Sequence, residues 1–248
     1  MYFLDVGQGD AILISDSYGR QIIIDGGPND KLSSYLSKLM PFGDKKIEAI
    51  LVTHAHYDHY KGLIKVLENY EVERIILPKQ VSSAKTWNKF MALIAEKNIL
   101  MQSPQEKSRI YIDENYLEII WQGMVAKDLN NSSVVSQFNV GDYDVLLMGD
   151  AGIVIENALM ANKKLEQVEI LKVGHHGSKY ASSEKFLNAT RPGYAVISVG
   201  KDNSYGHPHR EALMRLKSEG AEVFRTDLDG NILIKCASGK CGVEKLRI

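Results

Sequence analysis

Short apolar runs rich in β-branched residues recur along the whole chain, and most are followed closely by Gly, Asp or Ser. Runs of this length with such endings are typical of β-strands. They fall at 2–6, 11–15, 21–25, 47–53, 73–78, 168–174, 194–200, 221–226, 231–236 and 242–247, with a predicted hairpin over 108–122 and two further strands in 132–150. The fold must therefore be built around β-sheets.

Segments with helical periodicity lie between these strands. The clearest is 29–40, where an Asn-Asp start precedes Leu32, Leu36 and Leu39 on one helical face. Further helices are predicted at 60–70, 82–98, 152–160, 182–189 and 209–219. Two β-rich halves that each carry helices predict an α/β (α+β) fold with the four layers of an αββα sandwich. No Pro- or Ser-rich linker separates the halves, so we expect a single domain over residues 1–248.

Composition and charge narrow the range of partners. The chain has 30 Lys and Arg against 31 Asp and Glu, a formal charge of −1, so any affinity for phosphate must be local rather than global. No apolar run reaches the roughly 18 to 20 residues that span a bilayer. The first residues also lack the basic and apolar regions of a secretory signal. If the chain is complete, we expect a cytoplasmic protein without a membrane segment.

The two cysteines, Cys236 and Cys241, occur in the sequence CASGKC, where the flanking alternation places them on opposite arms of a hairpin. A disulfide requires an oxidising compartment, and one C-x4-C pair offers too few ligands for a zinc site. We therefore interpret them as a reduced structural pair.

The histidines are concentrated in three short segments. Residues 51–63, LVTHAHYDHYKGL, hold three of the seven, and the others occur as pairs in LKVGHHGS and SYGHPH. Beyond a strand end, residues two apart can turn to the same side, so His54 and His56 can share one metal ion. Asp58 and His59, adjacent at a predicted helix start, suit a second ion. Such ligands fit zinc, and also manganese or iron as the share of oxygen ligands grows.

Other candidate ligands also follow strands. The strand DVLLMGD ends in Asp150, a position suited to a carboxylate that bridges two metals, and EILKVGHHGS ends in His175 and His176. IIIDGG delivers Asp25 in the same way, and we interpret Asp25 as an acceptor that fixes the tautomer of a histidine ligand. Because Asp-Gly and Gly-Asp pairs also start turns, the assignment of Asp25 and Asp150 depends on the histidine cluster nearby.

The motif THAHYDH resembles the H-x-H-x-D-H signature of the metallo-β-lactamase superfamily. FLDVGQGDAILI, LLMGD, LKVGHHGS and YGHPH resemble the soluble hydrolase domain of ComEC-type DNA-uptake channels, and the resemblance runs from Phe3 to about Ile234. It implies an αββα fold with a two-metal site between the sheets. The channel proteins carry many membrane helices that are not found in this chain, so a role in DNA uptake does not follow.

The resemblance also implies a set of metal ligands. It assigns His54 and His56 to the first metal, Asp58 and His59 to the second, Asp150 to a bridge, and His175 or His176 to the remaining position on the second metal. Most of the superfamily has a further histidine on the first metal, where this chain offers NNSSVV. Asn131 or Asn130 could be a weak ligand there, or leave the position to water. We therefore expect a loosely bound first metal and two divalent ions, Zn²⁺ or Mn²⁺.

Two metals roughly 3.5 to 4 Å apart can hold a hydroxide between them and accept charge from an in-line displacement at phosphorus. We therefore predict hydrolysis of a phosphodiester, in DNA or a nucleotide, with Asp58 and Asp150 positioning the hydroxide. His207 is the predicted proton donor to the leaving oxygen, and whichever of His175 and His176 is not a ligand is the second choice.

Further residues flank these motifs. Ser178 lies in HHGS, where backbone N–H groups can approach a phosphate, and Lys179 is one of the nearest cations. Tyr205 is one of four tyrosines placed to stack on a base. The sequence DVGQGD lacks the ending of a phosphate-binding loop, so we interpret it as a tight turn between strands.

Two other functions stay open. The near-neutral charge favours a small substrate over long DNA, which could be a phosphocholine-type diester, a carboxylic ester or a lactam. The chain could also be a metal-binding interaction module without activity, although its intact ligand set argues against this. The sequence makes no prediction of oligomeric state.

Overall fold

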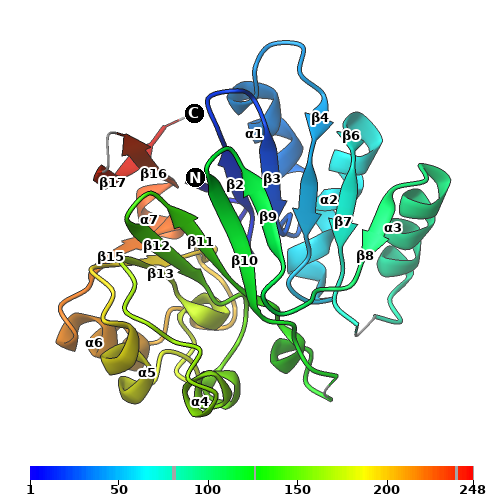
Figure 1. Ribbon diagram of the computed structural model, residues 1–248. Helices are drawn as coiled ribbons and strands as arrows, with labels where there is room; N and C mark the ends of the chain where they lie inside the picture. The colour runs from blue at the N-terminus through cyan, green and yellow to red at the C-terminus, as the bar shows by residue number, and fades with distance from the viewer. Residues whose placement is uncertain (80–81, 126, 238–239, 248) are drawn as a thin grey trace.

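The computed structural model describes residues 1–79, 82–125, 127–237 and 240–247 (Figure 1). Its first sheet has eight strands, in the order β17 (Lys240–Leu246), β16 (Asn231–Ala237), β1 (Tyr2–Phe3), β2 (Ile12–Ser15), β3 (Gln21–Ile24), β5 (Ala49–Leu51), β7 (Arg74–Ile76) and β8 (Leu100–Gln102). The second has seven, in the order β15 (Glu222–Arg225), β14 (Tyr194–Ile197), β13 (Ile170–Lys172), β12 (Tyr143–Leu147), β11 (Val135–Val140), β10 (Asn115–Trp121) and β9 (Arg109–Ile112).

Helices cover the outer face of each sheet. The first sheet carries α1 (Lys31–Leu39), α2 (Tyr57–Asn69) and α3 (Lys85–Glu96), and the second carries α4 (Ile153–Ala161), α5 (Glu184–Thr190) and α6 (Arg210–Ser218). The smaller elements are a ladder of β4 (Lys46–Ile47) with β6 (Glu71–Val72), the short helix α7 (Thr226–Asp229), and the 3-10 turns η1 (Leu129–Ser132) and η2 (Gly174–Gly177). The predicted four-layer αββα sandwich is confirmed.

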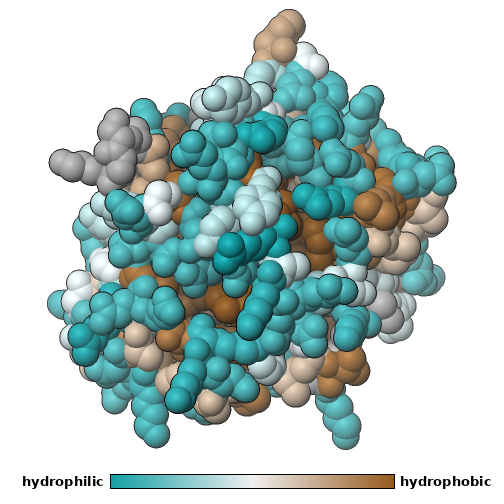
Figure 2. Space-filling model, in the orientation of Figure 1, coloured by the Kyte–Doolittle hydropathy of each residue, from teal (hydrophilic) through white to brown (hydrophobic). Residues whose placement is uncertain are grey.

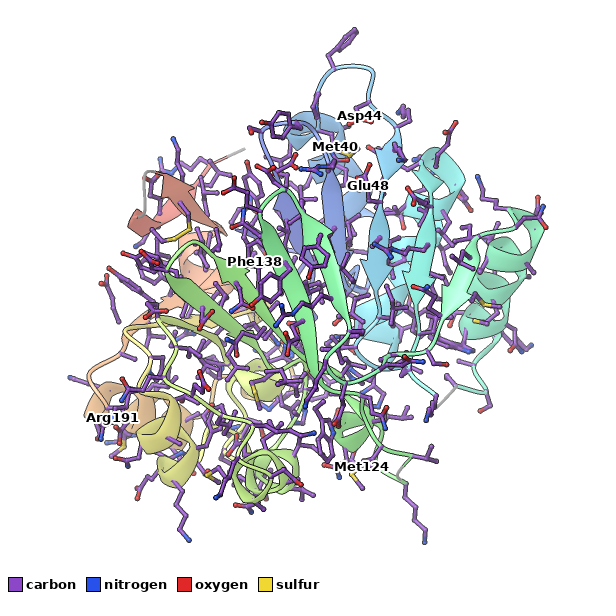
Figure 3. All side chains as sticks on the ribbon, viewed as in Figure 1. Met40, Asp44, Glu48, Met124, Phe138 and Arg191 are labelled. Atoms are coloured by element: carbon purple, nitrogen blue, oxygen red, sulfur yellow. A yellow bond between two sulfur atoms is a disulfide. The ribbon has the colours of Figure 1, made fainter. Side chains whose placement is uncertain are left out.

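Strand alternation explains how the layers are held together. Along β3, Ile22 and Ile24 pack between the two sheets, whereas Ile23 packs in the layer beneath the helices. Phe138 on β11, labelled in Figure 3, also belongs to the layer between the sheets. Burying one such side chain contributes about 1.5–3 kcal/mol, so these apolar layers stabilise the sandwich. Hydrophilic residues cover most of the face shown in Figure 2, with hydrophobic ones visible in gaps between them.

The parallel strands bring the predicted site residues to one edge of the sandwich. In the first sheet β3 runs parallel to β5, and in the second β12, β13 and β14 are parallel neighbours. Strands that run in the same direction end at the same edge. The loops after these strands, which carry the histidine motifs and the predicted aspartates, therefore meet there.

The predicted helices and strands are present, with small differences. The sequence did not indicate β8, because Leu100, Met101 and Gln102 are all exposed and show no alternation. It also did not indicate α7, which has only four residues. The predicted strand at 47–53 is divided between β4 and β5.

The prediction for the cysteines was wrong. Cys236 on β16 lies directly opposite Cys241 on β17 in the antiparallel register, so the two sulfur atoms meet, and they form a disulfide. The turn between them lies outside the described residues. Within the described part of the chain, no helix has the length and apolar character needed to cross a membrane.

Candidate metal centre

The segment that joins β5 to α2 carries four of the predicted ligands. His54 is fully buried just beyond β5, and His56 immediately precedes the first turn of α2. That turn contains Asp58 and His59, of which His59 is also fully buried. A carboxylate in the first turn is also favoured by the helix dipole.

Asp25 holds this segment from behind. Its Oδ1 atom accepts a hydrogen bond from the Thr53 backbone N–H at 2.8 Å, and its Oδ2 atom accepts one from the Thr53 hydroxyl at 2.6 Å. The same Oδ2 lies 2.7 Å from Nδ1 of His59. When Nδ1 donates to this carboxylate, Nε2 of His59 is left with a free lone pair. Asp25 thus has the contact expected of a residue that sets a tautomer, and that role stays a prediction.

Three buried atoms converge here and have no hydrogen-bond partner among the described residues: Nε2 of His59, Nε2 of His176 and Oδ1 of Asp150. His59 Nε2 lies 3.4 Å from Asp150 Oδ1, and His176 Nε2 lies 3.5 Å from Asp150 Oδ2 and 3.6 Å from Asp58 Oδ2. Ligand atoms of Asp58, His59 and His176 all lie within 4.8 Å of one another. Because unpaired buried polar groups are costly, this arrangement fits a divalent cation.

The electrostatics of this group favour the same interpretation. Burial opposes a charge on His176, but its carboxylate neighbours, Asp150 first, raise its pKa to about 10. Burial likewise opposes the charge on His59, whose pKa is nonetheless raised well above its ordinary value by Asp150 and Asp25. Carboxylates that attract a proton to an imidazole would also attract a metal ion in its place.

A second pocket adjoins the first and also uses Asp150. His54 Nε2 lies 3.0 Å from His56 Nδ1 and 3.7 Å from Asp150 Oδ2. Burial, followed by the neighbouring His59, lowers the pKa of His54 well below its ordinary value, so this imidazole is neutral, as a metal ligand must be. A cleft opens beside both pockets, and among the described residues it is lined by Gln8, His56, Tyr57, Asp58, Asn130, Asp150, His175, His176, Tyr205 and His207. Asn130 has a buried Oδ1 atom without a partner among these described residues. Asn131 instead directs its side-chain amide to Asp128 at 3.4 Å.

The two histidines of the HHGS turn differ in burial and in the partners of their rings. Both residues have left-handed backbone angles, with φ values of 47° for His175 and 53° for His176. His176 is buried, and its Nδ1 lies 2.9 Å from the Ser198 carbonyl, so its Nε2 faces the carboxylates. His175 is only partly buried on the cleft wall. Ser178 is buried next to this turn and Lys179 is exposed.

His207 lies next to these histidines in the cleft wall, with its ring centroid 5.3 Å from that of His175 and 6.2 Å from that of His176. Its ring packs almost parallel to that of Tyr205, with centroids 5.8 Å apart, and its Nδ1 atom is buried with no hydrogen-bond partner within the described ranges. Asn203 holds the backbone on both sides, accepting from His207 N–H at 3.1 Å and donating to the His207 carbonyl at 2.6 Å. Burial, together with His175 and other nearby imidazoles, lowers the pKa of His207 to about 4.

Three further residues at the site were not identified from the sequence. Gln8 lines the cleft and accepts from Gly200 N–H at 3.1 Å, and Asp10 forms a buried salt bridge with Lys172 behind the histidines. DVGQGD lies between β1 and β2, as predicted, but the connection is a longer loop over residues 4–11 rather than a tight turn, and it reaches the site. A lysine inside the apolar strand VEILKVG was the available signal for Lys172.

Comparison with other proteins supports the metal centre. The metallo-beta-lactamase superfamily profile matches residues 4–201. ComE operon protein 3 of Bacillus subtilis is 29% identical over 247 residues, covering 92% of this chain and 32% of that protein. Recombination protein 2 of Haemophilus influenzae is 26% identical over 258 residues, covering 98% and 30%. This chain therefore spans about a third of the length of the curated relatives it matches.

A solved structure shows the same fold at low sequence identity. Zinc-bound PqqB from Methylobacterium extorquens superposes with a TM-score of 0.61 at 11% identity, covering 88% of this chain and 85% of that one. The profile match extends over most of the chain and includes the HAHYDH, LLMGD and HHGS motifs. The chain belongs to the metallo-β-lactamase superfamily and resembles the hydrolase domain of ComEC-type proteins.

Proposed function

We propose that this chain, as one domain over residues 1–248, hydrolyses phosphodiester bonds with two divalent metal ions, Zn²⁺ or Mn²⁺. The proposal depends chiefly on the convergence of His59 Nε2, His176 Nε2 and Asp150 Oδ1, which are buried and have no hydrogen-bond partner in the part of the chain that the structure describes. When bound, two such ions supply an activated water and neutralise charge that develops on a phosphoryl group.

The residues of the chain divide the work around these ions. His54 and His56 would hold the first ion, Asp58, His59 and His176 the second, and Asp150, which faces both groups, would bridge them. This choice leaves His175 on the cleft wall, where its lone pair or proton is available to a substrate. His207 would donate a proton to the leaving oxygen, since its side chain lines the cleft beside these residues.

The lining of the cleft supports a small phosphodiester over long DNA. Among the described residues it contains four histidines, two tyrosines, two aspartates, Gln8 and Asn130, but no Lys or Arg. Without cations along the walls, a substrate phosphate would be held by the metal ions rather than by a basic track. Tyr57 and Tyr205 are 49% and 64% exposed, so each offers an aromatic surface to a base or another planar group. A nucleotide diester or the end of a DNA strand fits this lining.

The test is metal analysis followed by hydrolysis of bis(p-nitrophenyl) phosphate, single-stranded DNA and nitrocefin, each with Zn²⁺ and with Mn²⁺. We expect between one and two ions per chain and turnover of the two phosphodiesters. A metal content near zero after reconstitution would contradict the proposal.

A second candidate is a hydrolase of a small ester outside nucleic acids, such as a phosphocholine-type diester, a carboxylic ester or a lactam. The absence of Lys and Arg from the described cleft lining favours it over a DNA nuclease. Turnover of nitrocefin alone would select a lactam. Metal binding without turnover of any substrate would instead favour a metal-binding interaction module.

A further inference from the structure

Lys172 is a buried lysine on the inner face of the second sheet. On β13 it shares its side of the strand with Ile170, which packs between the sheets, whereas Leu171 packs beneath the outer helices. Its ammonium donates to the Gly149 carbonyl at 2.9 Å and forms a salt bridge with Asp10. The two side chains are only 1% and 2% exposed. Among the described residues, no other Lys or Arg is buried.

Asp10 reaches this lysine from the first sheet. It lies in the loop between β1 and β2, which packs tightly against the start of α2. At Gly9, φ is +138° and a Cβ atom would lie 2.2 Å from the Asp58 carbonyl oxygen, so only glycine permits this approach. The salt bridge therefore joins the two sheets directly behind the cleft.

The pair contacts the back of the metal centre on both sides. Asp10 Oδ1 lies 3.5 Å from His176 Nδ1, and Asp10 Oδ2 lies 4.0 Å from His59 Nδ1. The Gly149 carbonyl that accepts from Lys172 also accepts from His175 N–H at 3.1 Å, and Gly149 directly precedes Asp150. One ammonium thus links the Asp150 segment, the HHGS turn and the loop from the other sheet.

Fold stability alone does not account for such a pair. Burying an ion pair costs several kcal/mol per ion, and an apolar replacement of similar volume is often neutral or stabilising. The position of the pair offers a better reason. Without the ammonium, Asp10 would be free to compete with the Ser198 carbonyl for Nδ1 of His176, because it already lies 3.5 Å away. A turned His176 ring would no longer direct Nε2 at Asp150.

We propose that Lys172 and Asp10 are a positioning pair for the metal centre. Lys172 fixes the Gly149 carbonyl, and with it the start of the Asp150 segment, and it holds Asp10 away from His176. This role rests on the proposed metal-dependent function, since it requires His176 and Asp150 to be metal ligands. Residues that orient ligands in this way typically change metal affinity or activity by about 10- to 100-fold when replaced.

The test compares Lys172→Met and Asp10→Asn with the wild type and with Lys164→Met as the matched control. Lys164 also contacts a carboxylate, Glu106 at 2.5 Å, and a backbone carbonyl, Ile120 at 3.3 Å, but it does not line the cleft. Co²⁺ affinity is measured by competition with a coloured chelator, and the ligand geometry by the visible absorption of the Co²⁺-loaded protein. Circular dichroism reports whether each variant is folded.

We expect Lys172→Met to weaken Co²⁺ binding by about 10- to 100-fold, to alter the Co²⁺ spectrum, and to lower kcat more than it changes KM. Asp10→Asn should act in the same direction with a smaller loss, and Lys164→Met should change none of these. Wild-type Co²⁺ affinity and spectrum in folded Lys172→Met and Asp10→Asn would overturn the proposal. If Lys172→Met does not fold, the Co²⁺ affinity and spectrum of Asp10→Asn alone test the proposal.

Failure of the proposed function gives a different result. If the wild type binds Co²⁺ but hydrolyses no substrate, the phosphodiesterase proposal is wrong. The Co²⁺ affinities of Lys172→Met and Asp10→Asn then still test whether Lys172 and Asp10 position the metal ligands. If the wild type hydrolyses a diester and both variants bind Co²⁺ with wild-type affinity, only the proposal of a positioning pair is wrong.

Discussion

The two candidate metal pockets share Asp150 but are built differently. The pocket of Asp58, His59 and His176 takes its ligand atoms from both sheets, and these atoms lie within 4.8 Å of one another. The pocket of His54 and His56 takes both imidazoles from one loop, and its remaining candidate is the amide of Asn130. The imidazoles of one pocket are therefore brought together by the packing of the two sheets, whereas both imidazoles of the other come from a single stretch of sequence.

The distribution of charge differs in the same direction. Around His176, the carboxylates of Asp58 and Asp150 lie 3.6 and 3.5 Å from its Nε2 atom. Around His54 the one acidic neighbour is Asp150 at 3.7 Å among the salt bridges of the described residues. Because a buried cation gains most where carboxylates are closest, the His176 pocket should hold its ion more tightly than the His54 pocket.

The largest expected effect comes from removing the shared ligand. Asp150→Ala takes a carboxylate from both pockets, so both ions should be lost and hydrolysis of bis(p-nitrophenyl) phosphate should fall at least about 10³-fold, corresponding to several kcal/mol of charge stabilisation. Asp58→Ala should abolish hydrolysis as well but deplete mainly the ion at His176. Metal analysis and turnover measure both effects, with circular dichroism as a check on folding.

Asp142→Ala is the control for this pair, because Asp142 is exposed in the turn at the opposite end of β12. It should bind metal and turn over substrate like the wild type. Turnover within tenfold of the wild type in both Asp58→Ala and Asp150→Ala would place the chemistry elsewhere.

A smaller effect is expected for His207, which lines the cleft and belongs to none of the candidate metal groups found among the described residues. A general acid contributes typically about 10²- to 10⁴-fold, chiefly when the leaving group needs its proton. His207→Ala should therefore slow a nucleotide diester far more than a p-nitrophenyl ester and leave bound metal unchanged. The control is His209→Ala, because the His209 ring accepts a hydrogen bond from Lys179 N–H at 3.2 Å. This variant should show no such selectivity between the two substrates. Equal losses on both substrates with depleted metal would make His207 a ligand.

The pH dependence of this effect follows from the environment of His207. Burial and nearby imidazoles lower its pKa to about 4, so the protonated form that can donate decreases about tenfold per pH unit above that value. The ratio of wild-type to His207→Ala rates on the nucleotide diester should therefore fall as pH rises from 6 to 8. A ratio that stays constant over this range would mean that His207 acts in its neutral form.

The same contrast between a local pocket and one formed by packing determines how much of the metal site can be predicted from the sequence. His54, His56, Asp58 and His59 fall within six positions, so their local spacing alone predicted a metal site. The choice between His175 and His176 was not possible at that level, because both follow the same strand. It depends on backbone angles in the HHGS turn and on the Ser198 carbonyl from another strand.

The fold was predictable for a related reason. Alternation along strands such as β3 and the helical face of α1 directly report which side of each element is buried. Asp10 has no such local pattern, and a lysine within an apolar strand does not by itself identify the partner of Lys172, since their salt bridge forms only when the first loop of one sheet meets the inner face of the other. Likewise, NNSSVV alone does not distinguish Asn130 from Asn131.

The smallest expected effect tests that distinction. Asn130 lines the cleft, and its Oδ1 atom has no partner among the residues that the structure describes, whereas the side-chain amide of Asn131 donates to Asp128. A neutral amide is a weaker ligand than an imidazole, so the ion at His54 should be stripped first by brief chelation and activity should return with added Mn²⁺ or Zn²⁺.

Asn130→Ala should accelerate this first loss severalfold, at or below the lower end of the about 10- to 100-fold range for ligand-orienting residues. Asn131→Ala, the matched control, should leave the rate of loss unchanged. Two ions that leave together, or a faster loss in Asn131→Ala than in Asn130→Ala, would show that the two pockets do not differ in the way their ligands suggest.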